Sequence, residues 1–374
     1  MNRSRIFFTS ILYCLLGSVL LTCHSSNKGK RDMTKEDSLD EIKVKVFGEQ
    51  LERTTMSGDA KFYNEAFDET CLKEAISDNS IVKSSFDSEF GLSFFHAYLN
   101  EGNFCNETVN NGGQYHFVRQ YVENEQYHIV FRKYVDLGNM EIRDYTLKSK
   151  EGKVKICGGY IYNNSATLSN DLKYTVLYHV LKQTNPQGET HLLEEARTLL
   201  EQRKAAEAIA LLQLKKSIIA DYPYYKDLYI RALYETDSKN FLNRLKDMVC
   251  DSLIDKRTQL LHTLLYCSNQ GLVDPCQATI EELIPYTGDD PIYLLFFAHA
   301  NFVAKNYQIA LDWYHTAEQN MALIWDVWYG QLACYASLND KTNFHKTLEK
   351  SQEIFGMTAE QTADFKTRHF PKMR

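Results

Sequence analysis

The strongest constraint on the fold is a 34-residue period that runs through the second half of the chain. Self-similarity at a fixed period of about 20 to 50 residues is the signature of stacked repeat units. The pattern is also helical, so the sequence predicts five helical hairpins over residues 191–357. A single irregular α-helical domain is the alternative interpretation. Two columns that follow the period are apolar throughout, namely Ala196, Ile230, Leu264, Ala298 and Leu332, and Ala208, Leu242, Cys276, Ala310 and Phe344.

The segment 304–314 gives these repeats a resemblance to a known family. Its sequence, AKNYQIALDWY, resembles the second helix of a tetratricopeptide (TPR) unit. The resemblance implies that the hairpins bury their apolar faces against one another and form a continuous core with a curved groove. Residues 358–374 would then supply a capping helix and tail.

The TPR-like frame also predicts a partner-binding groove. By resemblance to the repeat family, the groove is lined by residues on the first helix of each unit. Several of these residues are apolar or aromatic, as expected of a surface that holds a peptide or a helix. Packing inside the core is the alternative interpretation for each position. The candidate groove residues are Arg197, Tyr224, Arg231, Tyr234, Leu261, Leu265, Leu295, His299, Phe302 and Tyr329.

The first half of the chain has a different pattern. A helical pattern over residues 38–105 is followed by segments rich in Tyr, Val, Phe and Ile, separated by turn signals. We expect strands over residues 114–122, 125–135, 140–148 and 153–162, and a helix over residues 171–182. Short loops make neighbouring strands antiparallel. The fold class is therefore an α+β roll, with helices against a curved antiparallel sheet, followed by an all-α TPR-like helical repeat domain.

Residues 41–183 resemble the cone-shaped SnoaL-like fold, which is related to nuclear transport factor domains. The resemblance rests on element order and on the stretches 145–147 (YTL), 152–154 (GKV) and 160–162 (YIY). It implies a pocket between the sheet and the helices. Some members of the family are isomerases or dehydratases, whereas many only bind a ligand or dimerise, so a homodimer through this domain is one expectation. Residues 184–190 would link the roll to the repeats.

The polar residues His116, His128 and Asp144 lie on the expected strands. By the period of two along a strand, His128, Arg132 and Tyr134 share one face, and the opposite face carries the apolar core residues. We interpret the charged face as solvated surface, with a catalytic role as the less favoured alternative. No catalytic residue, cofactor or metal site is predicted, because the usual zinc, nucleotide and hydrolase motifs are absent from the sequence.

The N-terminus has the pattern of an export signal. Arg3 and Arg5 precede an uncharged apolar run over residues 6–21, which is shorter than the ~20 residues of a membrane-spanning helix. The run ends at Leu20-Leu21-Thr22-Cys23, which resembles the cleavage site of a bacterial lipoprotein. The resemblance implies a signal peptide over residues 1–22, lipidation of Cys23 and a tether over residues 23–40. Ordinary secretion and an uncleaved anchor are the alternatives.

The spacing of the cysteines argues against a zinc site, and the net charge argues against a nucleic-acid partner. Seven cysteines follow Cys23 without a C-x-x-C pair, so no zinc site or disulfide framework is predicted, although one or two disulfides remain open. A net charge of −7 disfavours a nucleic-acid binder. Nine of the acids lie in residues 258–340 beside a single base, Lys305, which is consistent with steering of a basic partner or with a solvated convex face.

These features predict a lipoprotein anchored in the cell envelope and facing the periplasm or the cell surface. Its expected function is that of a scaffold or adaptor that binds a partner protein in the TPR-like groove. The alternative is a SnoaL-like enzyme or small-ligand-binding domain that the repeats dock to another protein. A carbohydrate-handling accessory role has only the abundance of aromatic residues in its favour.

Overall fold

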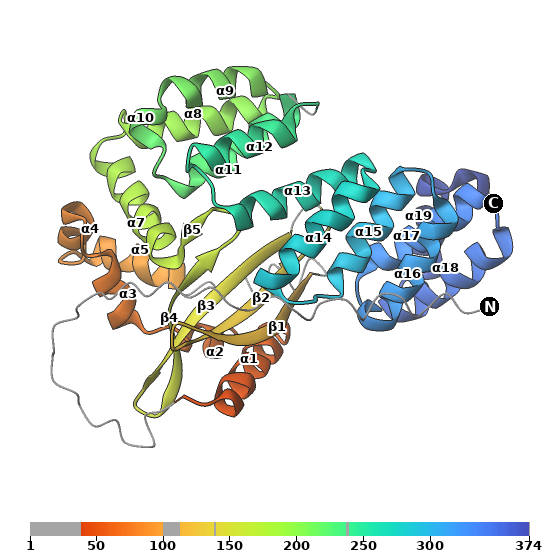
Figure 1. The fold of residues 1–374 in the computed structure, drawn as a ribbon, viewed down its shortest axis with the longest axis horizontal. Helices are drawn as coiled ribbons and strands as arrows, with labels where there is room; N and C mark the ends of the chain where they lie inside the picture. The colour runs from red at the N-terminus through yellow and green to blue at the C-terminus, as the bar shows by residue number, and fades with distance from the viewer. Residues whose placement is uncertain (1–38, 100–112, 138–139, 237–238, 374) are drawn as a thin grey trace, which may run out of the picture. The chain divides into compact units, whose positions relative to one another are not determined.

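An antiparallel meander of five strands, in the order β1-β2-β3-β4-β5, lies at the centre of the first half of the chain (Figure 1). The computed structural model describes residues 39–99, 113–137, 140–236 and 239–373. The four long strands begin and end within two residues of the positions predicted from the sequence. The strands are β1 (Gln114–Glu123), β2 (Gln126–Tyr134), β3 (Met140–Lys150), β4 (Lys153–Ile161) and β5 (Ala166–Thr167).

Two tight turns set the register of this sheet. Asn124 and Glu125 both have positive φ between β1 and β2, and Glu151 and Gly152 both have positive φ between β3 and β4. Two-residue loops with positive φ at both positions match the right-handed twist of the strands that they join. The strands therefore pair with their immediate neighbours in sequence.

Helices that precede and follow the strands along the chain pack against the inner face of the sheet. Ile129, Phe131 and Tyr145 point from this face into the core and are almost fully buried. The Tyr115 ring stacks on Phe131 with centroids 4.6 Å apart, and the Tyr63 and Tyr145 hydroxyls are 3.2 Å apart. Aromatic rings thus fill the interior of the roll. The helices are α1 (Glu41–Met56), α2 (Ala60–Glu65), α3 (Glu69–Ile76), α4 (Ser80–Ser85), α5 (Glu89–Leu99) and α7 (Leu168–Thr184).

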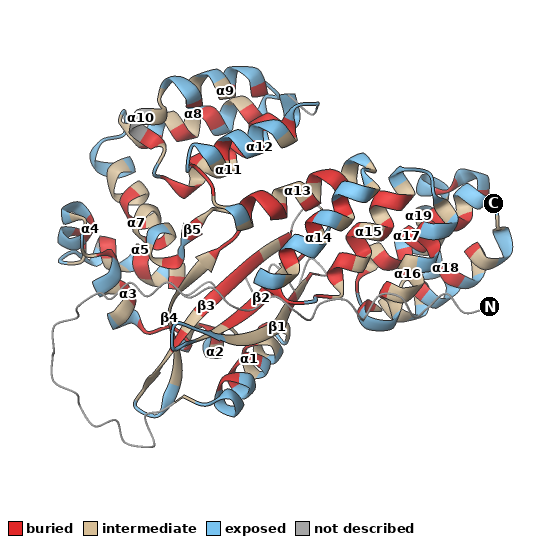
Figure 2. Cartoon of the chain, in the orientation of Figure 1, coloured by how far each residue is buried: buried red, intermediate tan, exposed pale blue. Residues whose placement is uncertain are grey.

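The opposite face of the sheet is also buried, which corrects the prediction of a solvated charged surface. Arg132 and Tyr134 are 2% and 1% exposed. Arg132 Nε donates to Asp290 Oδ2 at 2.7 Å, and the Tyr134 hydroxyl donates to Asp326 Oδ2 at 2.5 Å. Both acceptors belong to the C-terminal helical half of the chain. Helices therefore cover this face of the sheet, which the sequence pattern predicted to be exposed to solvent (Figure 2).

The second half of the chain is a run of helical hairpins, and the two helices of each hairpin pack against each other (Figure 1). The first helices of the five hairpins begin at residues 189, 223, 256, 292 and 325, so successive starts are 34, 33, 36 and 33 residues apart. The hairpins are α8 (Glu189–Glu201) with α9 (Ala205–Leu214), α11 (Pro223–Thr236) with α12 (Phe241–Cys250), α13 (Lys256–Gln270) with α14 (Val273–Thr287), α15 (Ile292–Val303) with α16 (Tyr307–Met321), and α17 (Trp325–Leu338) with α18 (Lys341–Phe355). A short helix, α10 (Lys216–Ile219), follows α9.

The apolar column that contains Ala196 lies entirely in the core of these hairpins, whereas in the column that contains Ala208 one member, Leu242, is only half-buried. Ala196, Ile230, Leu264, Ala298 and Leu332 are all at most 3% exposed. The same inward position therefore recurs in every hairpin, as the period predicts. An antiparallel sheet with helices followed by an all-α region is confirmed as the coarse architecture.

The C-terminus closes the last hairpin. Helix α19 (Ala359–His369) begins with a capping box in which Thr358 and Gln361 bond each other's backbone N–H groups, and a 3-10 turn (Pro371–Met373) follows. Phe370 packs on Phe344 with ring centroids 5.2 Å apart. Within the described ranges, no helix is long and apolar enough to cross a membrane.

Candidate functional site

The ten predicted groove residues do not line one continuous groove. Leu261 and Leu295 are completely buried and belong to the core between helices. His299 is largely buried, and its burial lowers its pKa. The other seven residues line three separate pockets, which we call the tyrosine pocket (Arg197, Tyr224), the sheet–helix pocket (Arg231, Tyr234, Leu265) and the C-terminal pocket (Phe302, Tyr329).

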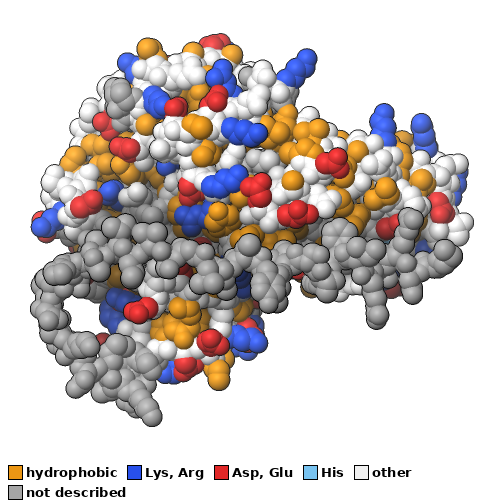
Figure 3. All heavy atoms as spheres, viewed as in Figure 1, with side chains coloured by type: hydrophobic (Ala, Val, Ile, Leu, Met, Phe, Trp, Pro, Cys, Tyr) orange, Lys and Arg blue, Asp and Glu red, His pale blue; other side chains and the backbone are white. Residues whose placement is uncertain are grey.

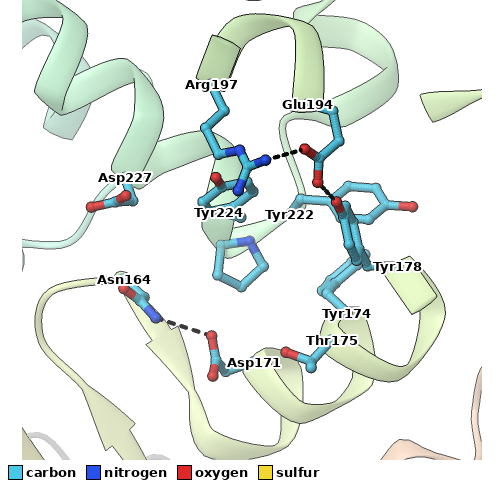
Figure 4. Close-up of a pocket in the computed structure, with 11 residues that line it drawn as sticks. Asn164, Asp171, Tyr174, Thr175, Tyr178, Glu194, Arg197, Tyr222, Tyr224 and Asp227 are labelled. Atoms are coloured by element: carbon cyan, nitrogen blue, oxygen red, sulfur yellow. Dashed lines mark hydrogen bonds and ion pairs between the residues drawn. The ribbon is translucent and has the colours of Figure 1, made fainter. Parts of the chain in front are cut away.

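The tyrosine pocket lies between α7, α8 and the start of α11 and has a volume of about 440 Å³ (Figure 4). Helix α7 contributes residues 171, 174, 175 and 178, which share one helical face because they are three or four positions apart. The pocket is lined by Asn164, Asp171, Tyr174, Thr175, Tyr178, Glu194, Arg197, Tyr222, Pro223, Tyr224 and Asp227.

Two carboxyl groups of this pocket are poorly hydrated. Burial raises the pKa of Asp171, although hydrogen bonds from the Tyr98 hydroxyl (2.5 Å) and the Asn164 amide (3.0 Å) act in the opposite direction. Burial also raises the pKa of Asp227, and the positive charge of Arg231 opposes that rise. A cation that entered the pocket would interact with these carboxylates with little screening by solvent.

Glu194 holds the charged rim of the pocket together. Its carboxylate accepts from Arg197 Nη2 at 2.9 Å and from Lys182 Nζ at 3.3 Å, and it also accepts from the Tyr178 hydroxyl. Figure 4 shows Arg197 and Tyr178 on either side of this carboxylate. Arg197 is therefore already neutralised by Glu194, which leaves Asp171 and Asp227 as the acidic groups of the pocket.

Tyrosine rings form the apolar part of the wall. The Tyr174 and Tyr222 rings lie 4.8 Å apart, and the Tyr222 hydroxyl donates to Glu189 Oε2 at 2.9 Å. Burial raises the pKa of Tyr174, Tyr222 and Tyr224, so all three hydroxyls stay protonated at neutral pH. The pocket thus offers aromatic surface, neutral hydroxyls and carboxylates.

The sheet–helix pocket adjoins the tyrosine pocket, because Asp227 lines both. Its volume is about 860 Å³. Burial lowers the pKa of His262 in its wall to about 4, so this imidazole is neutral at pH 7. The lining comprises Lys133, Val135, Met140, Glu141, Asn163, Asp227, Ile230, Arg231, Tyr234, Glu235, Phe241, His262, Leu265, Tyr266 and Asn269.

The C-terminal pocket is formed partly by the end of the chain itself. It has a volume of about 380 Å³ and contains Phe370 and Met373 beside Phe302 and Tyr329. The Tyr329 ring lies 5.7 Å from the Phe370 ring. Tyr329 therefore contacts the chain's own C-terminal segment, and Phe302 lines the same pocket.

The polar strand residues pair locally. His128 Nδ1 lies 3.0 Å from Asp144 Oδ1, and the Tyr121 hydroxyl donates to the other Asp144 oxygen. His116 Nδ1 lies 2.9 Å from Glu52 Oε1. None of these residues lines the three pockets. In the part of the chain that the structure describes, no group of three or more His, Cys, Asp or Glu side chains could hold a metal ion.

The acidic stretch 258–340 divides into two groups. Asp274, Glu281, Glu282, Asp289 and Asp312 are exposed. The other four have local roles. Asp290 pairs with Arg132, Asp326 accepts from Tyr134, Glu318 pairs with Lys350, and Asp340 caps α18. Figure 3 shows acidic and basic side chains interspersed on the visible face, with no large patch of one sign.

Sequence reasoning missed the wall that α7 contributes to the tyrosine pocket. A spacing of Asp171, Tyr174, Thr175 and Tyr178 along one helical face was the available signal. This spacing does not show that α8 and α11 pack opposite the same face of α7. The predicted lipidation site, Cys23, lies outside the described residues.

A comparison with known protein families finds no family that matches this chain, and comparisons with curated proteins and with solved structures find no match either.

Proposed function

We propose that this chain is an envelope-anchored scaffold protein that binds a polypeptide segment of a partner protein in the adjoining tyrosine and sheet–helix pockets. The observation that carries the proposal is the shared wall residue Asp227, which makes the two pockets neighbours. Five of the ten predicted groove residues line this combined space. Two adjoining pockets suit an extended peptide, which can place successive side chains in each of them, better than a compact small molecule.

The chemistry of the pockets favours a segment with a basic side chain. Arg143 and Arg231 act on Asp171 and Asp227 through their charge, but no positive charge lies at hydrogen-bond distance from either carboxylate among the contacts found in the described residues. A lysine or arginine of the partner would supply that charge while its methylene stem packs on Tyr174 and Tyr222. The exposed acids of residues 258–340 would steer such a partner toward the protein.

The finer fold assignments belong to the same proposal. Hairpin starts that are 33 to 36 residues apart, and a buried column in every hairpin, support TPR-like repeats. The order of helices, meander and α7 supports a SnoaL-like roll in front of them. The proposed division is a roll over residues 41–183, a linker over 184–190 and hairpins over 191–357, and the roll would act as a docking or dimerisation module.

Membrane attachment through Cys23 is the remaining part of the proposal. The apolar run and the sequence Leu20-Leu21-Thr22-Cys23 support it. Mass spectrometry of the mature protein from cell envelopes would measure the N-terminal peptide. An acylated Cys23 is the expected result, and an unmodified N-terminus beyond Cys23 would contradict the lipid anchor.

Peptide selection tests the binding function. A random phage-displayed peptide library is selected on the purified chain, and the dissociation constants of the enriched peptides are measured by fluorescence anisotropy. We expect enrichment of Lys or Arg, and about tenfold weaker binding to Asp227→Asn and Tyr224→Ala, which corresponds to about 1.4 kcal/mol.

The matched control is Glu353→Gln, which removes an exposed carboxylate on α18, outside residues 258–340, and leaves both pockets intact. It should bind the selected peptides like the parent chain. Peptides without basic residues, or peptides whose affinity is the same for all variants, would contradict the proposed site.

A second candidate is an enzyme in the roll, and the His128–Asp144 hydrogen bond favours it because a carboxylate can orient an imidazole for proton transfer. A substrate must be able to reach this imidazole. Modification by diethyl pyrocarbonate, mapped by mass spectrometry, measures that access. The exposed His191 is the reference, and a His128 that stays unmodified in the native chain would remove this candidate.

A further inference from the structure

The segment that leads into α3 is fixed against β4 by backbone contacts. Asp68 N–H donates to the Ile156 carbonyl at 2.8 Å, and Ile156 N–H donates to the Ala66 carbonyl at 2.8 Å. Phe67 and Ile156 thereby form a parallel β-bridge. The bridge therefore holds the residues after Phe67 close to the residues after Ile156, although the two stretches are far apart in sequence.

Two cysteines occupy this junction. The Cys71 thiol donates to the Cys157 carbonyl oxygen, with Sγ and O 3.5 Å apart, and the Cys157 thiol donates to the Thr146 carbonyl oxygen at 3.6 Å. Both side chains are half-buried. A small oxidant can therefore reach them, whereas Cys267, Cys276 and Cys334 are buried.

The surroundings of the two thiols are polar and charged. Lys148 Nζ forms an ion pair with Asp68 Oδ2 at 2.6 Å, and Asp68 is the N-cap of the helix that carries Cys71. Burial raises the pKa of Cys157 to about 11, the neighbouring Cys71 adds to this rise, and the positive charge of Lys148 opposes it. The two sulfur atoms are thus close enough to affect each other electrostatically.

We propose that Cys71 and Cys157 form an intramolecular disulfide that joins α3 to β4. The inference does not rest on the binding function. An oxidising compartment, such as the one implied by export of the chain, would preserve such a bond.

The bond forms by thiol–disulfide exchange with a low-molecular-weight disulfide such as oxidised glutathione. One cysteine thiolate attacks a glutathione sulfur, which breaks the S–S bond of glutathione and releases one glutathione thiolate. The second cysteine then attacks the mixed disulfide and releases the second glutathione. The protein dithiol is oxidised by two electrons, oxidised glutathione is reduced to two thiols, and the two thiol protons pass to these products.

The experiment uses the purified chain after incubation with oxidised glutathione. Tryptic digestion without reductant, followed by mass spectrometry, should reveal peptide 62–73, which contains Cys71, linked to peptide 156–173, which contains Cys157. A thiol titration in denaturant should show a loss of two free thiols. The disulfide should also raise the melting temperature by roughly 5 °C, because it constrains the unfolded chain.

Matched serine variants make the result specific. Cys71→Ser and Cys157→Ser should each abolish the cross-linked peptide pair and the rise in melting temperature. Cys250→Ser removes an exposed thiol elsewhere and should leave both unchanged. The proposal is overturned if Cys71 is instead linked to Cys105 in peptide 84–119, or if both thiols carry separate glutathione adducts or remain free.

Discussion

Arg132 on β2 and Asp290 in front of α15 form a buried ion pair across 158 positions of sequence, with Nε and Oδ2 2.7 Å apart. Both side chains are 3% exposed. Asp290 also accepts from the Ile292 backbone N–H at 2.9 Å, so the same carboxylate satisfies the first N–H group of α15. The pair therefore connects the outer face of the sheet to the helical half of the chain.

Removal of Arg132 should destabilise the protein strongly. Arg132→Met leaves the Asp290 carboxylate buried without its cation, and breaking one side of a buried pair costs about 3 to 5 kcal/mol. The free energy of unfolding in urea measures this loss. The double variant Arg132→Met/Asp290→Asn should recover most of the lost free energy of unfolding. The control is Asp289→Asn, which removes the exposed neighbouring carboxylate and should cost less than about 0.5 kcal/mol. An unaltered stability of Arg132→Met would show that the pair does not hold the two parts together.

Gly330 permits the close approach of α17 to α16. A Cβ atom at this position would lie 2.2 Å from the Tyr314 ring, and that ring is fully buried. Gly330→Ala should lower the stability by about 1 to 3 kcal/mol through overpacking, despite the better helix propensity of alanine. Gly158→Ala is the control, because its nearest neighbour would be 3.9 Å away. Thermal unfolding followed by circular dichroism compares the two, and equal melting temperatures would contradict the packing argument.

His262 should make the protein less stable in acid. Its folded pKa of about 4 lies below the ordinary value of 6.5, because burial disfavours the charged ring. The stabilisation is therefore complete above pH 6.5 and is lost as the pH falls toward 4, by up to about 3 kcal/mol. Urea unfolding at several pH values measures this slope. His262→Gln should remove the contribution of His262 to this pH dependence. His191→Gln, a change at an exposed histidine, should leave the pH dependence unchanged. The same pH dependence in the parent chain and both variants would contradict the role of His262.

Phe370 should couple the C-terminus to the last hairpin. Its ring contacts Tyr329, Phe344 and Phe365 and is 7% exposed. Phe370→Ala should cost about 3 kcal/mol, because it leaves a cavity among these rings. Amide hydrogen exchange should show faster exchange in α19 and in the end of α17. Lys372→Ala, an exposed change on the same segment, is the control, and unchanged protection in Phe370→Ala would show that the tail is not docked.

The local elements of this protein follow from its sequence alone. Alternating side chains and two-residue turns predict the four long strands within two residues of their ends. The 34-residue period predicts an inward column, and Ala196, Ile230, Leu264, Ala298 and Leu332 are buried as expected. These signals depend on residues that are close in sequence or regularly repeated, so no knowledge of the tertiary structure is needed to read them.

Only the tertiary structure decided what lies against each surface. Strand periodicity separated His128, Arg132 and Tyr134 from the core face, but a polar face exposed to water has the same pattern as one buried against Asp290 and Asp326. The tyrosine pocket and the Cys71–Cys157 junction likewise combine segments that are distant along the chain. Their formation depends on long-range packing, for which periodicity along one helix or strand contains no information.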